Sequence, residues 1–159
     1  MNYSNKQLTV LVLLRLAIGW HFAYEGLVKI FNPGWGSAIY LKDSQGWFSG
    51  MFNSLADNIA AMDVVNFVNE WGLLLIGLGL ICGAFVKVAS FSGIILLTLY
   101  YLSHPAFPGA SYAMPMEGSY LWVDKNIVEA LALLVVIYLP TSQIIGLDRL
   151  LKKYLPKII

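Results

Sequence analysis

The chain has 159 residues, of which 58% are hydrophobic and only 12% are charged, and its formal net charge is +1. Soluble domains usually carry about 25% charged residues, so this composition excludes an ordinary water-soluble globule. The charge leaves no basic surface for nucleic acid outside the C-terminal tail. Cys82 is the only cysteine, which excludes an intrachain disulfide and a thiolate-rich metal site.

Four apolar runs approach the length of about 20 residues that a helix needs to cross a bilayer. They cover residues 8–31, 64–86, 88–103 and 126–147. We therefore predict an all-α protein, an integral membrane four-helix bundle that forms one domain over residues 1–159. The short link around Lys87 predicts a tight antiparallel hairpin. Pro140, near the end of the fourth run, predicts a kink or an early stop.

The first run carries ionisable side chains at Arg15, His21, Glu25 and Lys29. A charge near the bilayer centre costs at least about 2.5–3.5 kcal/mol, so such residues normally face the bundle interior. His21, Glu25 and Lys29 are spaced by four and share one helix face. Arg15 is too far along the axis to pair with Glu25, and we expect it to reach the inner interface or to meet Asp148 as a structural charge.

The first long loop, residues 32–63, is too apolar to be a plain linker. Its hydrophobic residues recur at helical spacing, which predicts an outer amphipathic helix on the membrane surface or over the bundle mouth. An interfacial anchor and a functional lid both fit this pattern. The residues that define it are Phe48, Met51, Phe52, Leu55 and Ile59.

The remaining runs place polar residues at a similar depth. At a rise of 1.5 Å per residue, Glu25, Glu70 and Glu129 lie roughly 7–10 Å below the outer surface. Asp124 is a candidate N-cap for the last helix. The sequence thus predicts a polar pocket in the outer half of the bundle above an aliphatic inner half. Its candidate ligand-binding residues are His21, Glu25, Lys29, Asn66, Glu70, Tyr101, His104, Lys125 and Glu129.

Three other interpretations of these residues stay open. Buried Glu–Lys and Glu–His pairs can hold helices together, at about 1–2 kcal/mol each in model peptides. His21 and His104 could ligate a haem, but only two histidines exist and they differ in depth. A carboxylate–histidine metal site is conceivable. We predict neither a metal nor a haem.

Basic residues set the predicted orientation, because cytoplasmic loops are rich in Lys and Arg. One side of the membrane holds Lys6, Lys87, Arg149, Lys152, Lys153 and Lys157. The two long loops hold Lys42 and Lys125, among the acidic residues Asp43, Asp57, Asp63, Glu117 and Asp124. Both termini are therefore predicted to be cytoplasmic.

Three segments of the chain resemble the DoxX/DoxD family of small four-helix membrane proteins. They are RLAIGWHFAYEGLVKIFNPGWGSAIYL, NEWGLLLIGLGLICGAFVKVASFSGIILLTLYYL and EGSYLWVDKNIVEALALLVV. The resemblance implies a multi-pass protein of a bacterial-type cytoplasmic (inner) membrane. DoxD-type proteins are the small membrane subunit of thiosulfate:quinone oxidoreductase, and other relatives are linked to oxidative-stress complexes. The family-type positions are Arg15, Glu25, Gly26, Lys29, Glu70 and Glu129.

The leading functional hypothesis is a membrane subunit of a redox system that binds quinone or a small anionic substrate, such as a sulfur oxyanion. His21, Lys29 and Lys125 would attract the anion or the quinone oxygen. Glu25, Glu70 or Glu129 would relay protons. Whether the chain is itself catalytic or an accessory subunit stays open, as does its partner, a second protein or another copy. One alternative is a non-catalytic scaffold that binds a partner through its outer loops. The other is a small-solute transporter. Inverted repeats would favour a transporter, and this sequence lacks them.

Overall fold

The computed structural model describes residues 3–113 and 121–154, and in these residues every regular element is a helix. Among them, four helices are long and apolar enough to cross a membrane: Asn5–Ile30, Ile59–Cys82, Val86–Ser103 and Lys125–Gln143. The predicted all-α bundle of four spans is confirmed. Glu117 and Lys157, on which the predicted membrane orientation partly depends, lie outside the described residues.

The first span is α1 (Asn5–Ile30), which begins before the predicted residue 8 because a polar cap starts it. Ser4 accepts a hydrogen bond from the Gln7 backbone, and the Gln7 side chain accepts one from the Ser4 backbone. Such a capping box satisfies two backbone donors that a helix start leaves open. The helix ends at Ile30 with Phe31 as its C-cap, just before the Asn32–Pro33 pair, because a proline disfavours helical geometry in the residue before it.

The second span combines α4 (Ile59–Phe67), a π-helical turn η1 (Val68–Gly72) and α5 (Leu73–Cys82). It begins at Ile59 rather than residue 64, because the Asn58 side chain caps it by accepting from the Ala61 backbone. Gly83 ends it in the left-handed conformation (φ 65°), which glycine adopts without steric cost.

The third span, α6 (Val86–Ser103), follows almost immediately, and α5 and α6 pack together. This confirms the predicted hairpin.

The fourth span is interrupted earlier than its apolar run suggests. Asp124 caps α7 (Lys125–Tyr138) by accepting from the Ile127 backbone, as predicted. The helix stops before Pro140, and the chain continues as a short 3₁₀ turn, η2 (Thr141–Gln143), and a last turn, α8 (Asp148–Leu151). The early stop predicted at Pro140 is therefore confirmed, and the apolar run to residue 147 is not one continuous helix, since proline cannot donate in a helix interior.

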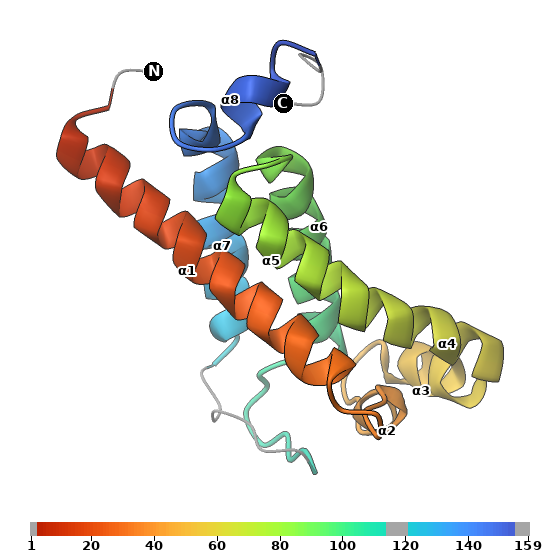
Figure 1. Cartoon of the computed structure of the whole chain (residues 1–159). Helices are drawn as coiled ribbons and strands as arrows, with labels where there is room; N and C mark the ends of the chain where they lie inside the picture. The colour runs from red at the N-terminus through yellow and green to blue at the C-terminus, as the bar shows by residue number, and fades with distance from the viewer. Residues whose placement is uncertain (1–2, 114–120, 155–159) are drawn as a thin grey trace.

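The helices pack in two close pairs, α1 with α5 and α6 with α7 (Figure 1). Glycines bring α1 and α5 together: a Cβ added to Gly26 would lie 2.6 Å from the Leu74 backbone nitrogen. Gly77 meets the α1 backbone at Ala23 in the same way. The common core consists of Ile18, Phe22, Leu73, Ile76, Leu80, Val86, Ala89, Leu96, Leu97, Leu133 and Val136.

The first long loop forms two helices, α2 (Ala38–Lys42) and α3 (Ser49–Asp57), which lie beside α4 at the end opposite the termini (Figure 1). Phe52 of the predicted amphipathic segment is buried against Leu41 and Met62. The segment is not one helix to Ile59, because Asn58 breaks it and starts α4. We call α2, α3 and their connecting residues the cap.

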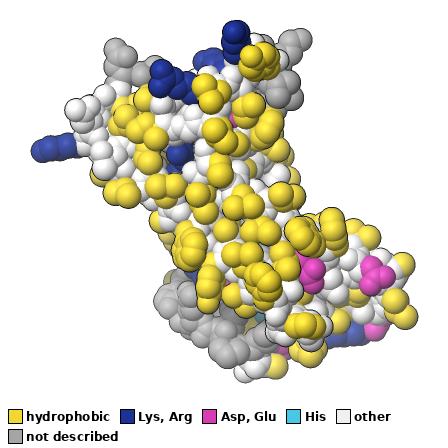
Figure 2. Space-filling model, in the orientation of Figure 1, with side chains coloured by type: hydrophobic (Ala, Val, Ile, Leu, Met, Phe, Trp, Pro, Cys, Tyr) yellow, Lys and Arg dark blue, Asp and Glu magenta, His cyan; other side chains and the backbone are white. Residues whose placement is uncertain are grey.

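The outer surface has the character of a bilayer-facing bundle. In Figure 2, hydrophobic side chains cover most of the visible face between the two ends, and most of the Lys and Arg in view gather at the end that carries α8. Exposed apolar side chains such as Val10, Leu13 and Trp20 lie along α1. These surfaces contact lipid. We call the end with the cap the loop end and the opposite end the terminal end.

Candidate functional site

An ionisable pair joins α1 to α7 in the half of the bundle nearer the loop end. The Nδ1 atom of His21 lies 2.8 Å and 3.0 Å from the two carboxylate oxygens of Glu129. The His21 side chain is 44% exposed and that of Glu129 is 13% exposed. The imidazole is therefore partly exposed, while the carboxylate that holds it is largely enclosed.

Further charges surround this pair. Lys29 donates to the Glu25 carboxylate over 2.7 Å, one turn apart on α1, and its ammonium lies 5.5 Å from the centre of the Trp35 ring. Glu25 and Lys125 both act electrostatically on His21. Five of the predicted site residues thus form one electrostatic group: His21, Glu25, Lys29, Lys125 and Glu129.

An open groove of about 530 Å³ lies between α1 and α7 beside the pair. Its walls are mainly apolar, and the His21–Glu129 pair is set into them. With Nδ1 taken by Glu129, Nε2 is the ring nitrogen left for a ligand, and it has no partner among residues 3–113 and 121–154. We call this space the α1–α7 groove; it is lined by Ile18, His21, Val123, Asp124, Lys125, Val128, Glu129 and Ala132.

Asn66 and Glu70 lie elsewhere. Asn66 accepts from the backbone and the hydroxyl of Ser37, over 3.0 Å and 2.6 Å, and so ties the residue that precedes α2 to α4. Glu70 lies in η1 and does not line the groove, and its carboxylate makes no hydrogen bond or ion pair within the described part of the chain. The structure brings Glu25 and Glu129 into one group but not Glu70.

Tyr101 is also outside the groove: it donates to the Trp122 carbonyl over 2.9 Å in the second long loop. Its neighbour Tyr100, which is not among the candidate ligand-binding residues, donates instead to Asn69 over 2.5 Å and joins α6 to η1. Tyr100 and Tyr101 are consecutive residues of α6, so their side chains point in directions about 100° apart. Sequence alone offers no signal for which of them meets the neighbouring span.

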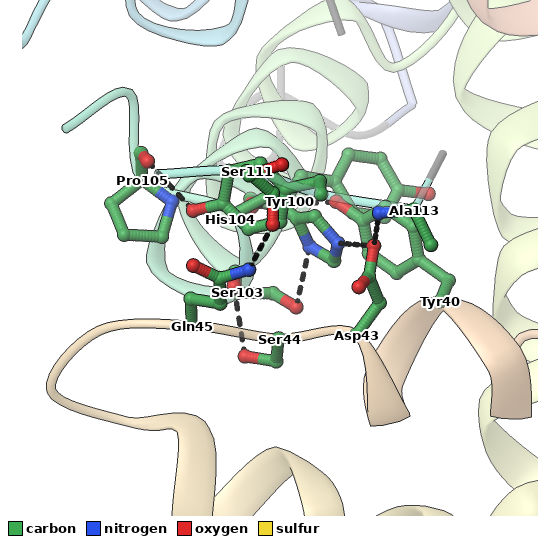
Figure 3. Close-up of polar contacts among 11 residues, drawn as sticks. Tyr40, Asp43, Ser44, Gln45, Tyr100, Ser103, His104, Pro105, Ser111 and Ala113 are labelled. Carbon is green, nitrogen blue, oxygen red and sulfur yellow. Dashed lines mark hydrogen bonds and ion pairs between the residues drawn. The ribbon is translucent and has the colours of Figure 1, made fainter. Parts of the chain in front are cut away.

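His104 belongs to a separate cluster at the loop end (Figure 3). Its ring is only 3% exposed, stacks on Tyr40 with ring centres 3.8 Å apart, and lies against Tyr112. Nδ1 is 3.0 Å from the Ser103 hydroxyl, and Nε2 is 3.8 Å from the Asp43 carboxylate. Burial lowers the pKa of His104, and the Asp43 charge opposes that shift. Burial also raises the pKa of Tyr40.

This cluster ties the two long loops to each other and to the end of α6. Asp43 accepts from the Ala113 backbone over 2.8 Å, and Gln45 donates to the Ser111 carbonyl (Figure 3). Ser44 donates to the Ser103 carbonyl over 2.8 Å. His104 therefore has a place in loop packing. Among the described residues, its hydrogen-bond, ion-pair and ring partners differ from those of His21, so the two histidines belong to separate clusters.

A third buried charge lies at the terminal end. Arg15 is only 2% exposed, so it does not extend to the interface as one expectation had it. It donates to the Thr141 hydroxyl over 3.1 Å and to the Ile145 carbonyl over 2.8 Å. Asp148 acts on it electrostatically while accepting from the backbone of Phe85 and Val86. These residues join α1, η2 and the α5–α6 turn.

A family model describing DoxX matches residues 10–105, more than half of the chain. The chain belongs to the DoxX family. The match covers α1, the cap, the second span and α6, so one wall of the α1–α7 groove lies inside the DoxX region and the other lies beyond it. No curated protein and no solved structure matches this DoxX chain.

Proposed function

We propose that this chain is a membrane subunit of a redox system and binds a quinone in the α1–α7 groove. The observation that carries the proposal is the make-up of the groove, whose apolar residues Ile18, Val128 and Ala132 surround the His21–Glu129 pair. Small-molecule sites are mostly apolar with a few polar groups that fix orientation. A quinone has the matching character, because its ring and tail are apolar and its two oxygens need a hydrogen-bond partner.

The place of the groove supports a lipid-soluble ligand. Both helices that form it are candidate membrane spans, and the groove is open rather than enclosed. A quinone dissolved in the bilayer could therefore enter sideways between α1 and α7. Membership of the DoxX family, together with the resemblance to quinone-linked DoxD-type subunits, supports the same ligand class.

A small anionic substrate, such as a sulfur oxyanion, fits the groove less well. Lys125 would attract an anion, but Asp124 and Glu129 line the same groove and would repel it. In the proposed arrangement the chain supplies the quinone site, and a partner protein supplies the other half-reaction. We place the protein in a bacterial-type cytoplasmic membrane with both termini cytoplasmic. The two ends of the chain lie at one end of the bundle, where most visible Lys and Arg gather (Figures 1 and 2).

The proposal is tested most directly by a substitution that places a large side chain in the groove. Val128 and Leu131 lie on α7 and are each 58% exposed, but only Val128 lines the groove. Val128→Trp should weaken the binding of a decyl-substituted benzoquinone at least about ten-fold, a change of about 1.4 kcal/mol. Leu131→Trp is the matched control and should bind like the wild type. Equal affinity of both variants, measured by isothermal titration in detergent, would contradict the proposal.

A scaffold role is the second candidate, favoured by an aromatic group on the long loops. Trp47, Phe107 and Trp122 contact one another, with ring centres 4.9–6.3 Å apart. Trp47 is highly exposed, and aromatic residues are enriched where proteins bind partners. Under this role, Trp47→Ala would abolish recovery of the partner from native membranes and leave quinone binding unchanged.

A further inference from the structure

The His21–Glu129 contact determines which ring nitrogen of His21 carries the proton. Nδ1 lies 2.8 Å and 3.0 Å from the two oxygens of the Glu129 carboxylate. An ionised carboxylate can only accept hydrogen bonds, so the neutral imidazole must hold its proton on Nδ1 and donate it to Glu129. The other nitrogen, Nε2, then carries a lone pair and can only accept.

This tautomer distinguishes the two redox forms of a quinone. A hydroquinone presents hydroxyl groups that donate, whereas an oxidised quinone presents carbonyl oxygens that only accept. A lone pair on Nε2 accepts a hydrogen bond from a hydroquinone hydroxyl. The same lone pair is repelled by the carbonyl oxygen of an oxidised quinone, because both are acceptors. The contact at Nδ1 therefore sets the hydrogen-bonding preference of Nε2.

We propose that the α1–α7 groove is a hydroquinone site in which His21 Nε2 accepts a hydrogen bond, and then the proton, from one hydroxyl of the reduced ring. The inference rests on the proposed function and assigns its ligand a redox state. In the transfer, the O–H bond of the hydroquinone breaks and an N–H bond forms at Nε2. The products are a hydroquinone monoanion and an imidazolium, and no electron moves in this step.

The surrounding charges act on both products of the transfer. Glu129 contacts the ring that becomes positive, and Glu25 acts on the same ring from α1. Lys125 acts on His21 from α7 and lines the groove, where it stabilises the anion. Asp124 lines the groove as well and opposes the anion. Glu129 is a positioning residue, because its carboxylate contacts His21 Nδ1 and so sets the tautomer of the ring.

A pH dependence follows from the same geometry. Once His21 is protonated, both nitrogens donate, and Nε2 then binds the carbonyl of the oxidised quinone. The neutral site prefers hydroquinone and the protonated site prefers quinone. The ratio of the two affinities should therefore reverse across the titration of His21, a behaviour that a purely structural His–Glu pair does not produce.

The test measures the affinity of the purified full-length chain for a decyl-substituted benzoquinone and for its hydroquinone, without oxygen, between about pH 5 and about pH 9, which brackets the usual imidazole range. One net hydrogen bond predicts that hydroquinone binds about five-fold more tightly at the high-pH end, with the order reversed at the low-pH end.

Two variants separate positioning from packing. Glu129→Gln offers Nδ1 an amide that can either accept or donate, so both tautomers form and the affinity ratio should approach one. His21→Gln should lose the pH dependence of the ratio. Glu70→Gln makes the same change on a carboxylate outside the groove and should keep the wild-type ratio and its reversal.

The possible results distinguish failure of the quinone site from failure of the hydroquinone preference. If neither form binds the wild type more tightly than Val128→Trp, the proposed function itself fails. If both forms bind but the ratio stays constant with pH, or Glu129→Gln keeps the wild-type reversal, the hydroquinone inference is wrong and the quinone site stands. If Glu129→Gln does not fold, the wild-type reversal and its loss in His21→Gln decide.

Discussion

At the scale of single residues, the buried Arg15 is a costly group to disturb. Its guanidinium donates to Thr141 and to the Ile145 carbonyl. Arg15→Gln would leave those acceptors and the Asp148 charge without their cation. We expect the free energy of unfolding to fall by about 2–3 kcal/mol, because buried groups that lose a charged partner keep their desolvation cost. Thermal unfolding in mild detergent measures this.

Arg149→Gln is the matched control, since it removes the same charge from an exposed position on α8. It should change the free energy of unfolding by no more than about 0.5 kcal/mol, as is usual for surface substitutions. Similar losses in both variants would mean that net charge at the terminal end matters and that the buried contacts of Arg15 do not.

His104 gives the fold a pH dependence of defined sign. Burial lowers its pKa in the folded protein, while the unfolded chain binds a proton at about pH 6.5. Below that pH the unfolded state takes up the proton first, so stability is complete above it and decreases as pH falls towards the folded-state pKa. The melting temperature should therefore drop between about pH 7.5 and about pH 5.5, around that imidazole value.

The non-titrating variant His104→Asn isolates this contribution from the other ionisable groups. Its melting temperature should depend less steeply on pH over the same range than that of the wild type. Parallel pH profiles for the two proteins would show that His104 does not titrate differently on unfolding, contrary to the burial of its ring.

The position of a polar side chain along its helix could be predicted from the sequence, but the direction in which that side chain points around the helix could not. Glu25 and Glu129 fall in one electrostatic group with His21, as their similar depth predicted. Glu70 has the same predicted depth but lies in η1, where π-helical hydrogen bonds change the rotation per residue. His104 follows the last helical residue of α6, so its ring direction depends on loop geometry that no periodicity encodes.

At the scale of helices, the α1–α5 contact depends on glycine. A Cβ at Gly26 would lie 2.6 Å from the Leu74 nitrogen and 2.8 Å from the Glu70 carbonyl, both of which are backbone atoms. Gly26→Ala should force the helices apart and lower the free energy of unfolding by about 1–3 kcal/mol, the usual cost of overpacking. Unfolding in a denaturing detergent series measures the loss.

Gly72→Ala is the control on the facing span, where the added Cβ meets only the Val68 side chain at 3.6 Å. Since alanine has a higher helix propensity than glycine, this variant should be unchanged or slightly more stable, by up to about 1 kcal/mol. If Gly26→Ala were as stable as Gly72→Ala, close approach of α1 and α5 would not be what these glycines provide.

The number and order of the helices were predictable because apolar length is a strong signal in a membrane chain. Their ends were not, because polar caps extend a helix beyond its apolar run. Ser4 starts α1 before residue 8, and Asn58 starts α4 before residue 64. Pro140 has the opposite effect and ends α7 inside its apolar run, and this end was predicted from the proline itself.

At the scale of the whole molecule, the cap and the bundle should unfold as one unit. Phe52 of α3 is buried against Met62 of α4, and the His104 cluster fixes the cap to α6. Phe52→Ala should therefore destabilise the whole protein by about 3–5 kcal/mol, the usual cost for a buried phenylalanine. Hydrogen exchange followed along the chain measures whether the bundle loses protection together with the cap.

Met51→Ala, on the exposed side of the same helix, is the comparison. It should leave protection unchanged in both regions. If Phe52→Ala released only the cap while the bundle kept its protection, the cap would be a separately folded surface segment, closer to the interfacial anchor that the sequence also allowed.

The central claim is that the α1–α7 groove holds a quinone in the native membrane. The most direct measurement is extraction of the wild type, Val128→Trp and Leu131→Trp from native membranes in mild detergent, followed by mass spectrometry of the small molecules that remain bound. We predict that a quinone or hydroquinone accompanies the wild type and Leu131→Trp and is depleted from Val128→Trp. Equal amounts in all three, or none in the wild type, would contradict the claim.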